Sequence, residues 1–239
     1  MPNKLDANKT PVSKQDLLLV LWQAWYQIFG EEPKHEAVCV LGGQWALETG
    51  WGKSMWDFNL GNVKSVDGDG HDYQFFGCGE ELTLSVAQHA VHDSPLVKVV
   101  RTYAVGNTPM ASVWITPEHP WCRFRAFNSL LEGAVDYVKL LNKRFQKSWP
   151  AVIAGDPALF AHYLKQQHYY TADETQYTNS IKSTFHTMMG VPVNFTHPDL
   201  TDAQKASVQN LVAMTMVQSL DDILSAPSTM PTDDASAMA

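Results

Sequence analysis

The stretch of sequence that decides the fold is Ala46-Leu47-Glu48-Thr49-Gly50-Trp51-Gly52-Lys53-Ser54. It closes a predicted helix that starts at Pro33 and carries on one face Ala37, Val38, Leu41, Trp45 and Glu48. Gly50 ends this helix, since glycine readily adopts the left-handed conformation of a C-cap. Glu48 is therefore expected in the last helical turn, on the apolar side of the helix.

A carboxylate in this position favours its protonated form, because burial and the negative end of the helix dipole both disfavour the charge. Glycoside cleavage needs such a general acid near neutral pH to protonate the leaving oxygen. A second carboxylate, or the substrate itself, then handles the oxocarbenium charge. Glu48 is the candidate for the acid. The alternative is a solvated glutamate at a frayed helix end, since most glutamates are exposed.

Four blocks of this sequence resemble the lysozyme-like glucosaminidases of peptidoglycan, glycoside hydrolase family 73. Residues 46–54 are similar to the signature Leu-Glu-Ser-Gly-Trp-Gly, and the stretch similar to Asn-Leu-Phe-Gly-Ile-Lys is Asn59-Leu60-Gly61-Asn62-Val63-Lys64. The block similar to Phe-Arg-x-Tyr-x-Ser is Phe124-Arg125-Ala126-Phe127-Asn128-Ser129. The block similar to Tyr-Ala-Thr-Asp-x-x-Tyr is Tyr170-Thr171-Ala172-Asp173 with Tyr177. The blocks follow the family's order across residues 13–190.

The resemblance implies that Glu48 is the catalytic acid and that a second carboxylate lies near Glu80 or Glu81. Weaker candidates for the second carboxylate are Asp67, Asp69, Asp72 and Glu118. Gly61-Asn62 departs from the family's Phe-Gly and is equally similar to turns of transglycosylase-type and goose-type lysozymes. In a lytic transglycosylase the same glutamate acts as acid and then base, so no second carboxylate is required.

Most of the substrate-contacting residues are also implied by the resemblance, whereas Trp51 is a candidate because its flat apolar ring lies next to the proposed acid. Tyr170 is expected to line the cleft near the scissile sugar as a catalytic residue, and the residues expected to bind substrate are Trp51, Asn59, Asn62, Phe124 and Tyr177. Each has an alternative role in structure: asparagine beside glycine is first a turn residue, and tryptophan is more often core.

Composition excludes several other classes of function. The chain has 239 residues, is 45% hydrophobic and carries a formal net charge of -8, which disfavours nucleic acid as a partner. The cysteines, Cys39, Cys78 and Cys122, show no CxxC spacing, so at most one disulfide could form. We expect no metal and no cofactor: His89 and His92 lack a third ligand at fixed spacing, and Cys122 beside His119 is a weak nucleophile candidate.

The predicted fold class is mainly α (α+β): a lysozyme-like helical domain with a small β-lobe and a C-terminal helical extension. Capping residues mark helix starts at Ser13, Ser129, Asp156, Thr171 and Thr201. Gly106-Asn107 predicts a hairpin loop, and residues 80–92 stay open between strand and helix. The predicted organisation is a flexible segment 1–12, the glycosidase domain 13–190 with a β-containing insertion at about 63–122, a helical extension 191–225 and a disordered tail 226–239.

The predicted function is cleavage of β-1,4 glycosidic bonds in peptidoglycan glycan strands by an endo-β-N-acetylglucosaminidase. The alternatives are a muramidase or lytic transglycosylase on the same fold, and a non-catalytic wall-binding or virion structural module. The chain shows no export signal and no apolar run of about 18 residues, so we expect no membrane insertion. Delivery to the wall by a phage or a secretion machinery, with a delivery or immunity partner, is the corresponding expectation.

Overall fold

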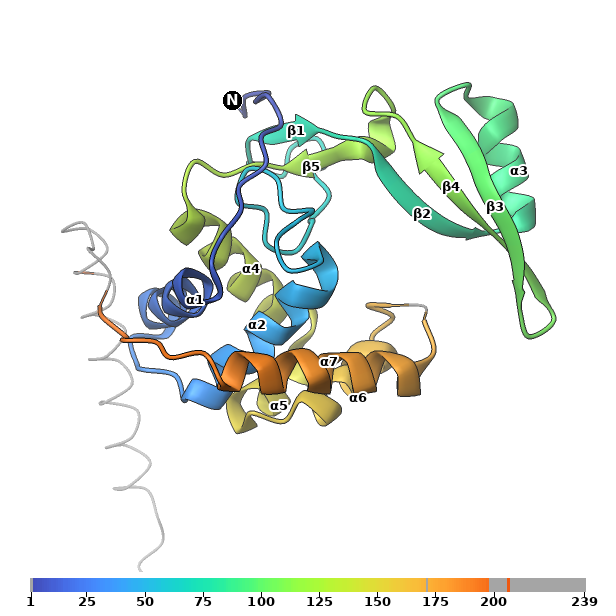
Figure 1. The fold of residues 1–239 in the computed structure, drawn as a ribbon. Coiled ribbons are helices and arrows are strands. Elements are labelled where there is room, and N and C mark those ends of the chain that lie inside the picture. Colours follow the sequence, from blue (N-terminus) through green and yellow to red (C-terminus); the bar gives the residue numbers. More distant parts are fainter. Residues whose placement is uncertain (1, 171, 198–205, 207–239) are drawn as a thin grey trace, which may run out of the picture.

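A computed structural model of the chain describes residues 2–170, 172–197 and 206. The predicted helix at 202–225 and the predicted tail 226–239 lie outside the described residues, apart from residue 206. The described chain forms a helical body and, to one side of it, a smaller part built around a sheet (Figure 1). This is the mainly helical α+β architecture that the sequence predicts.

Six helices make up the body: α1 (Lys14–Phe29), α2 (His35–Thr49), α4 (Leu130–Arg144), α5 (Trp149–Ala154), α6 (Pro157–Gln166) and α7 (Glu174–Met189). The predicted start of the first helix at Ser13 and the predicted end of the second at Gly50 are confirmed, and the second helix begins at His35, two residues after the predicted Pro33. The Ser13 side chain accepts from the Asp16 amide, and Gly30 and Gly50 end their helices in the left-handed conformation. These local contacts fix where each helix stops, so sequence alone locates them.

Helix α2 is the central element of the body, because almost its whole length is buried. Helix α7 lies directly against it: a Cβ at Gly43 would stand 3.1 Å from the Phe185 backbone nitrogen. Larger side chains at Gly43 would push the two helices apart. The close approach matters for the site, since α2 carries Glu48 at its end and α7 carries Tyr177.

Two details of the helices differ from the prediction. Helix α7 is capped by Asp173, whose Oδ1 accepts from the Gln176 amide at 2.9 Å, so the predicted cap at Thr171 is wrong. Aspartate two residues further along fits because its short carboxylate reaches the amide three positions later. Helix α5 was not predicted; its six residues are too few to show a helical period.

The smaller part consists of a three-stranded antiparallel sheet and one helix. Strands β2 (Cys78–Thr83), β4 (Thr108–Ile115) and β3 (Val97–Val105) pair in that order, and α3 (Leu84–Asp93) packs on one face. The hairpin between β3 and β4 turns at Gly106, as predicted. The stretch 80–92, which the sequence left open, is a strand up to Thr83 and a helix from Leu84. We call residues 78–122 the β-lobe.

A short two-stranded sheet joins the β-lobe to the body. Strand β1 (Tyr73–Phe75) pairs antiparallel with β5 (Arg123–Arg125), directly before and after the β-lobe in the chain. The N-terminal segment also meets this region: the Leu5 amide donates to the Tyr73 carbonyl at 2.8 Å, and Lys9 bridges to Trp56. The β-lobe and the strands that join it to the body share a small core, which is separate from the core of the helical body.

Candidate active site

Glu48 lies in the last turn of α2, where the side chain is half-buried. The Tyr177 hydroxyl donates to Glu48 Oε1 at 3.3 Å from α7, and the Tyr169 side chain forms a further hydrogen bond to the carboxylate. Burial raises the pKa of Glu48, and the two tyrosine hydrogen bonds offset part of this effect. Glu48 is thus shifted toward the protonated form that a general acid needs.

Three tyrosines surround Glu48, and we call Tyr137, Tyr169 and Tyr177 the tyrosine cluster. Tyr137 is buried on α4 and donates to Gln44 Oε1 at 2.7 Å, one helical turn before Glu48. Burial, and then the negative charge of Glu48, raise the pKa of Tyr137 and of Tyr169 well above their usual value. The cluster therefore remains protonated at neutral pH and presents hydroxyl groups, not charges, to Glu48.

Tyr170, the tyrosine that the sequence points to, supports the cluster from outside. Its ring stacks on Tyr177 with centroids 3.7 Å apart, and its hydroxyl donates to the Ala161 carbonyl at 3.1 Å. Tyr169 and Tyr137 were missed by the sequence analysis. The only signal for Tyr169 was its position next to Tyr170, because nothing in a sequence shows which of two adjacent tyrosines turns inward.

The loop after α2 is held in shape by Asn59 and Asn62. Asn59 is buried; its amide donates to the carbonyls of Val63 and Arg125, both at 3.0 Å, and its oxygen accepts from the Val63 amide. Asn62 takes a left-handed φ of 48° and donates to the Glu48 carbonyl at 3.0 Å. The polar groups of Asn59 therefore bond to the backbone. The amide nitrogen of Asn62 bonds to the end of α2 and so does not point toward a substrate.

A cavity of about 530 Å³ borders the tyrosine cluster. It is lined by Tyr137 and Tyr169 together with the basic side chains Lys64, Arg125 and Arg144. Two of the tyrosines around Glu48 thus line a cavity that is large enough for a sugar ring. The hollow is rimmed by cations although the chain as a whole is acidic.

Glu80 and Glu81 point to opposite faces of β2, as adjacent strand residues must. Glu80 pairs with Lys64 at 3.0 Å, and Lys64 lines the cavity beside the tyrosine cluster. Glu81 accepts from Ser112 at 2.5 Å and from Tyr103 on the other face. Those two hydrogen bonds lower the pKa of Glu81. Of the two candidates, Glu80 is the one connected to the cavity.

The weaker carboxylate candidates are engaged elsewhere. Asp67 pairs with Arg123, Asp69 lies 3.4 Å from Arg125, and Asp72 accepts from the Asn3 amide at 2.7 Å. Glu118 lines a depression next to the N-terminal segment. The three aspartates therefore stabilise the loops around β1 and β5.

Two predicted substrate-binding residues have other neighbours. Phe124 is 3% exposed and stacks on Phe76 with centroids 4.0 Å apart, which places it in the β-lobe core and corrects the expectation of sugar contact. Burial alternates along the short strand β5, and Phe124 occupies its one buried position. Trp51 lines a separate depression near the start of α1, under the Lys14 ammonium.

The other sequence candidates have plain structural explanations. His119 Nδ1 accepts from the Trp121 amide at 3.1 Å, and burial raises the pKa of Cys122 to about 12, so this pair is no activated nucleophile. His89 and His92 are exposed on α3. Within the residues that the structure describes, no group of three or more His, Cys, Asp or Glu side chains is placed to hold a metal ion.

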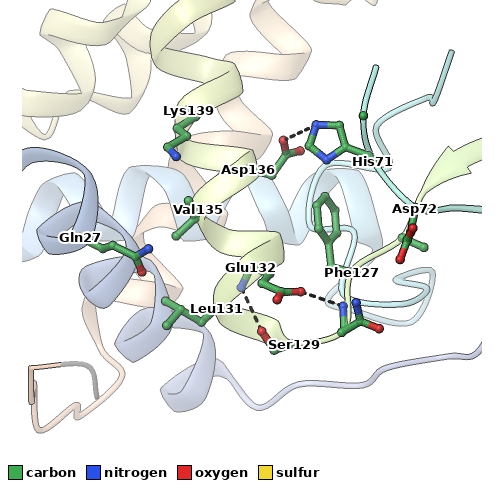
Figure 2. A pocket seen from close by; sticks show the side chains of 13 residues that line it. Gln27, His71, Asp72, Phe127, Ser129, Leu131, Glu132, Val135, Asp136 and Lys139 are labelled. Carbon is green, nitrogen blue, oxygen red and sulfur yellow. Dashed lines mark hydrogen bonds and ion pairs between the residues drawn. The ribbon is translucent and has the colours of Figure 1, made fainter. Parts of the chain in front are cut away.

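A second cavity, of about 540 Å³, lies on the opposite side of α4 (Figure 2). Leu131, Val135 and Lys139 of α4 line it, whereas Tyr137 and Leu141 of the same helix face the cavity beside Glu48. Side chains four positions apart lie on the same face of a helix, and Tyr137 is only two positions from Val135 and from Lys139. The two cavities therefore lie against different faces of α4. Asp136 and Glu132 in this cavity are held by His71 at 3.5 Å and by the Asn128 amide at 3.0 Å, respectively.

A half-buried carboxyl group with a raised pKa, bonded to Tyr177, has the properties that a general acid requires. Comparison with known proteins gives the family. Residues 26–189 match the family model Glucosaminidase, described as mannosyl-glycoprotein endo-beta-N-acetylglucosaminidase. Because the match covers more than half of the chain, the protein belongs to the glucosaminidase family and is a glycoside hydrolase of the endo-β-N-acetylglucosaminidase type. No curated protein matches the chain.

Three solved structures are similar to this chain. A C-terminally truncated glycoside hydrolase domain from Salmonella typhimurium FlgJ is 19% identical over 75% of this chain and 100% of that chain, with a TM-score of 0.42. A peptidoglycan hydrolase mutant from Sphingomonas sp. A1 is 20% identical over 82% and 99%, with a TM-score of 0.44. The catalytic domain of the autolysin Auto from Listeria monocytogenes is 15% identical over 75% and 87%, with a TM-score of 0.37.

Proposed function

We propose that Glu48 is the general acid of a glycosidase that cleaves β-1,4 bonds in peptidoglycan glycan strands, at the bond that follows N-acetylglucosamine. The observation that carries the proposal is the placement of Glu48: a half-buried carboxyl with a raised pKa, bonded to Tyr177 and to Tyr169, of which Tyr169 lines a cavity of about 530 Å³. The peptidoglycan substrate is supported by the four sequence blocks similar to the glucosaminidases of peptidoglycan.

In the proposed reaction, Glu48 donates its proton to the bridging oxygen as the glycosidic bond breaks. Water, or the N-acetyl group of the substrate, then reacts at the sugar carbon. The tyrosine hydroxyls hold the carboxyl in one orientation, and they stabilise the carboxylate that remains after proton transfer. Of the basic side chains that line the cavity, Lys64 is paired with Glu80 and Arg125 with Asp136, so Arg144 is the one suited to a carboxylate of the wall polymer.

Glu80 is the proposed second carboxylate. It is supported by the ion pair in which Glu80 Oε1 lies 3.0 Å from Lys64 Nζ, because Lys64 lines the cavity. Glu81 is the matched control, because it sits one residue further on the opposite face. We expect Glu80→Gln to lower turnover and Glu81→Gln to leave it within about twofold. Equal losses in the two variants would contradict this assignment.

The test of the acid is digestion of purified sacculi by the parent protein and by Glu48→Gln. Loss of a general acid costs about 10²- to 10⁴-fold in rate, whereas binding to sacculi should be unchanged. Glu36→Gln, an exposed position on the same helix, is the control. Unchanged cleavage by Glu48→Gln would refute the role of Glu48, and no cleavage by the parent would favour a binding module.

The chemical identity of the products separates the proposed bond from its alternatives. Mass spectrometry should find N-acetylglucosamine at the new reducing ends. Muramic acid at those ends would instead identify a muramidase, and loss of one water would identify a lytic transglycosylase.

In the described part of the chain, no helix is long and apolar enough to cross a bilayer. The proposed place of action is the wall, with delivery by a phage or secretion machinery and a delivery or immunity partner.

A further inference from the structure

The β-lobe is attached to the body through two chain segments that run side by side (Figure 1). Cys78 is the first residue of β2, where the chain enters the β-lobe, and Cys122 is the last residue of the short helix η1 (Pro120–Cys122), where it leaves. On the body side, Phe75 pairs with Arg123, and the Phe76 amide donates to the Cys122 carbonyl at 3.3 Å. The two cysteines therefore face each other at the base of the β-lobe.

The sulfur atoms of these cysteines lie 3.4 Å apart, and both residues are free thiols in the structure. Cys122 is fully buried and its thiol donates to the Ile115 carbonyl at 3.4 Å, whereas Cys78 is half-buried. A disulfide bond is about 2.05 Å long, so the two sulfurs need to approach by only about 1.4 Å. Side-chain rotation and a small shift of β2 supply such a distance.

We propose that Cys78 and Cys122 form a disulfide that closes the base of the β-lobe when the protein meets a disulfide oxidant. The bond would link the strand that carries Glu80 to the segment that leads into β5. It would also close a loop that contains the whole three-stranded sheet and α3. The sheet would then be covalently fastened to the body at the point where both connecting segments pass.

The chemistry is thiol–disulfide exchange with a small disulfide such as oxidised glutathione. The Cys78 thiolate attacks one sulfur of the reagent, which forms a mixed disulfide and releases one reduced thiol. Cys122 then loses its proton as its sulfur attacks the Cys78 sulfur, which forms the internal bond and releases the second thiol. The two protons of the cysteines leave with the two released thiols, and the two electrons reduce the reagent. Cys78 reacts first because it is the more exposed cysteine.

Cys39 provides an internal control, because it is buried in the core of the helical body. Cys78 and Cys122 belong to the separate core of the β-lobe. A bond between Cys39 and either of them would require both cores to unpack. The proposed pairing is thus the one that the fold permits without rearrangement. It does not depend on the proposed function, although an enzyme that acts on the wall would meet the oxidising conditions in which disulfides persist.

The direct experiment is to equilibrate the reduced, full-length chain with oxidised glutathione, block free thiols with N-ethylmaleimide and analyse peptides by mass spectrometry. We expect a loss of about 2 Da and a linked peptide pair that contains Cys78 and Cys122, with Cys39 alkylated only after denaturation. Alkylated Cys78 and Cys122, a glutathione adduct that persists on Cys78, or a link to Cys39 would each overturn the proposal.

A stability measurement on the same material gives a second readout. Closing this loop should raise the melting temperature by roughly 5 °C or more relative to the reduced chain. The Cys39→Ser variant should keep that shift and Cys78→Ser should lose it. An equal shift in Cys78→Ser would contradict the pairing. Cleavage of sacculi is assayed in parallel: a linked but inactive chain retains this inference and refutes only the proposed function.

Discussion

The Tyr177 hydroxyl lies 3.3 Å from Glu48 Oε1, and the ring of Tyr177 is stacked on Tyr170 at 3.7 Å. The ring stack fixes where the hydroxyl points, and the hydroxyl in turn fixes the carboxyl. A donor to the carboxylate lowers the pKa of Glu48, in opposition to the burial that raises it. The balance of these two effects sets the pH range in which Glu48 carries a proton.

The first prediction concerns Tyr177→Phe. Removal of the hydroxyl takes away a hydrogen bond that favours the charged carboxylate, so the pKa of Glu48 should rise further. The alkaline limb of the pH–rate profile should therefore move to higher pH. Tyr170→Phe is the control, since its hydroxyl bonds the Ala161 carbonyl and not Glu48. A limb that moves equally in both variants, or moves to lower pH in Tyr177→Phe, would contradict this account.

The second prediction is that Glu48 makes the folded protein less stable at neutral pH. Its pKa is higher in the folded than in the unfolded chain. The stability associated with its proton is therefore present below the unfolded value and lost as the pH rises through the folded value. Glu48→Gln mimics the protonated acid, so it should raise the melting temperature at pH 7 relative to the parent protein.

Calorimetry at two pH values checks this second prediction. At pH 3 both proteins carry a neutral side chain at position 48, so the difference in melting temperature should disappear. Glu36→Gln should show little difference at either pH, because this residue is exposed. A stabilisation by Glu48→Gln that is as large at pH 3 as at pH 7 would have another cause.

The third prediction concerns Gly133 on α4. A Cβ at this position would collide with the backbone carbonyl oxygen of Phe58, so the loop that precedes Asn59 can pack on α4 only against glycine. Gly133→Ala should therefore destabilise the fold by about 3 kcal/mol or more. Gly190→Ala is the control, because its nearest neighbour would be 3.7 Å away. Denaturant unfolding measures both, and equal stability of the two variants would show that the loop yields easily.

The fourth prediction concerns the ion pair between Arg125 and Asp136. Arg125 Nη1 lies 2.8 and 2.9 Å from the two Asp136 oxygens, and both side chains are largely buried. Asp136→Ala leaves a buried guanidinium with less compensation and should cost about 3 kcal/mol in unfolding free energy. The exposed pair of Arg101 and Glu81 is the contrast, and Arg101→Ala should cost at most about 1 kcal/mol.

What the sequence determined by itself was local. Ser13, Gly50 and Ser129 mark helix ends because a cap is made by residues within about four positions of each other. The Gly106 turn and the position of Glu48 at the end of α2 follow from the same short-range chemistry. The blocks that contain Glu48, Gly50 and Ser129 also carried part of the resemblance from which the family and the mainly helical α+β fold were expected.

Only the tertiary structure decided what surrounds Glu48. Tyr177 is 129 positions away from it, and Tyr137 reaches Gln44 across 93 positions. No periodicity links residues at such separations, since they meet only when α2, α4 and α7 pack together. The same packing buries Phe124 in a core and places Glu80, but not Glu81, next to Lys64, which lines the cavity. It also brings Cys78 next to Cys122, although the whole β-lobe separates them in the sequence. Side-chain direction at these positions is set by burial of distant apolar surfaces, which a linear pattern does not contain.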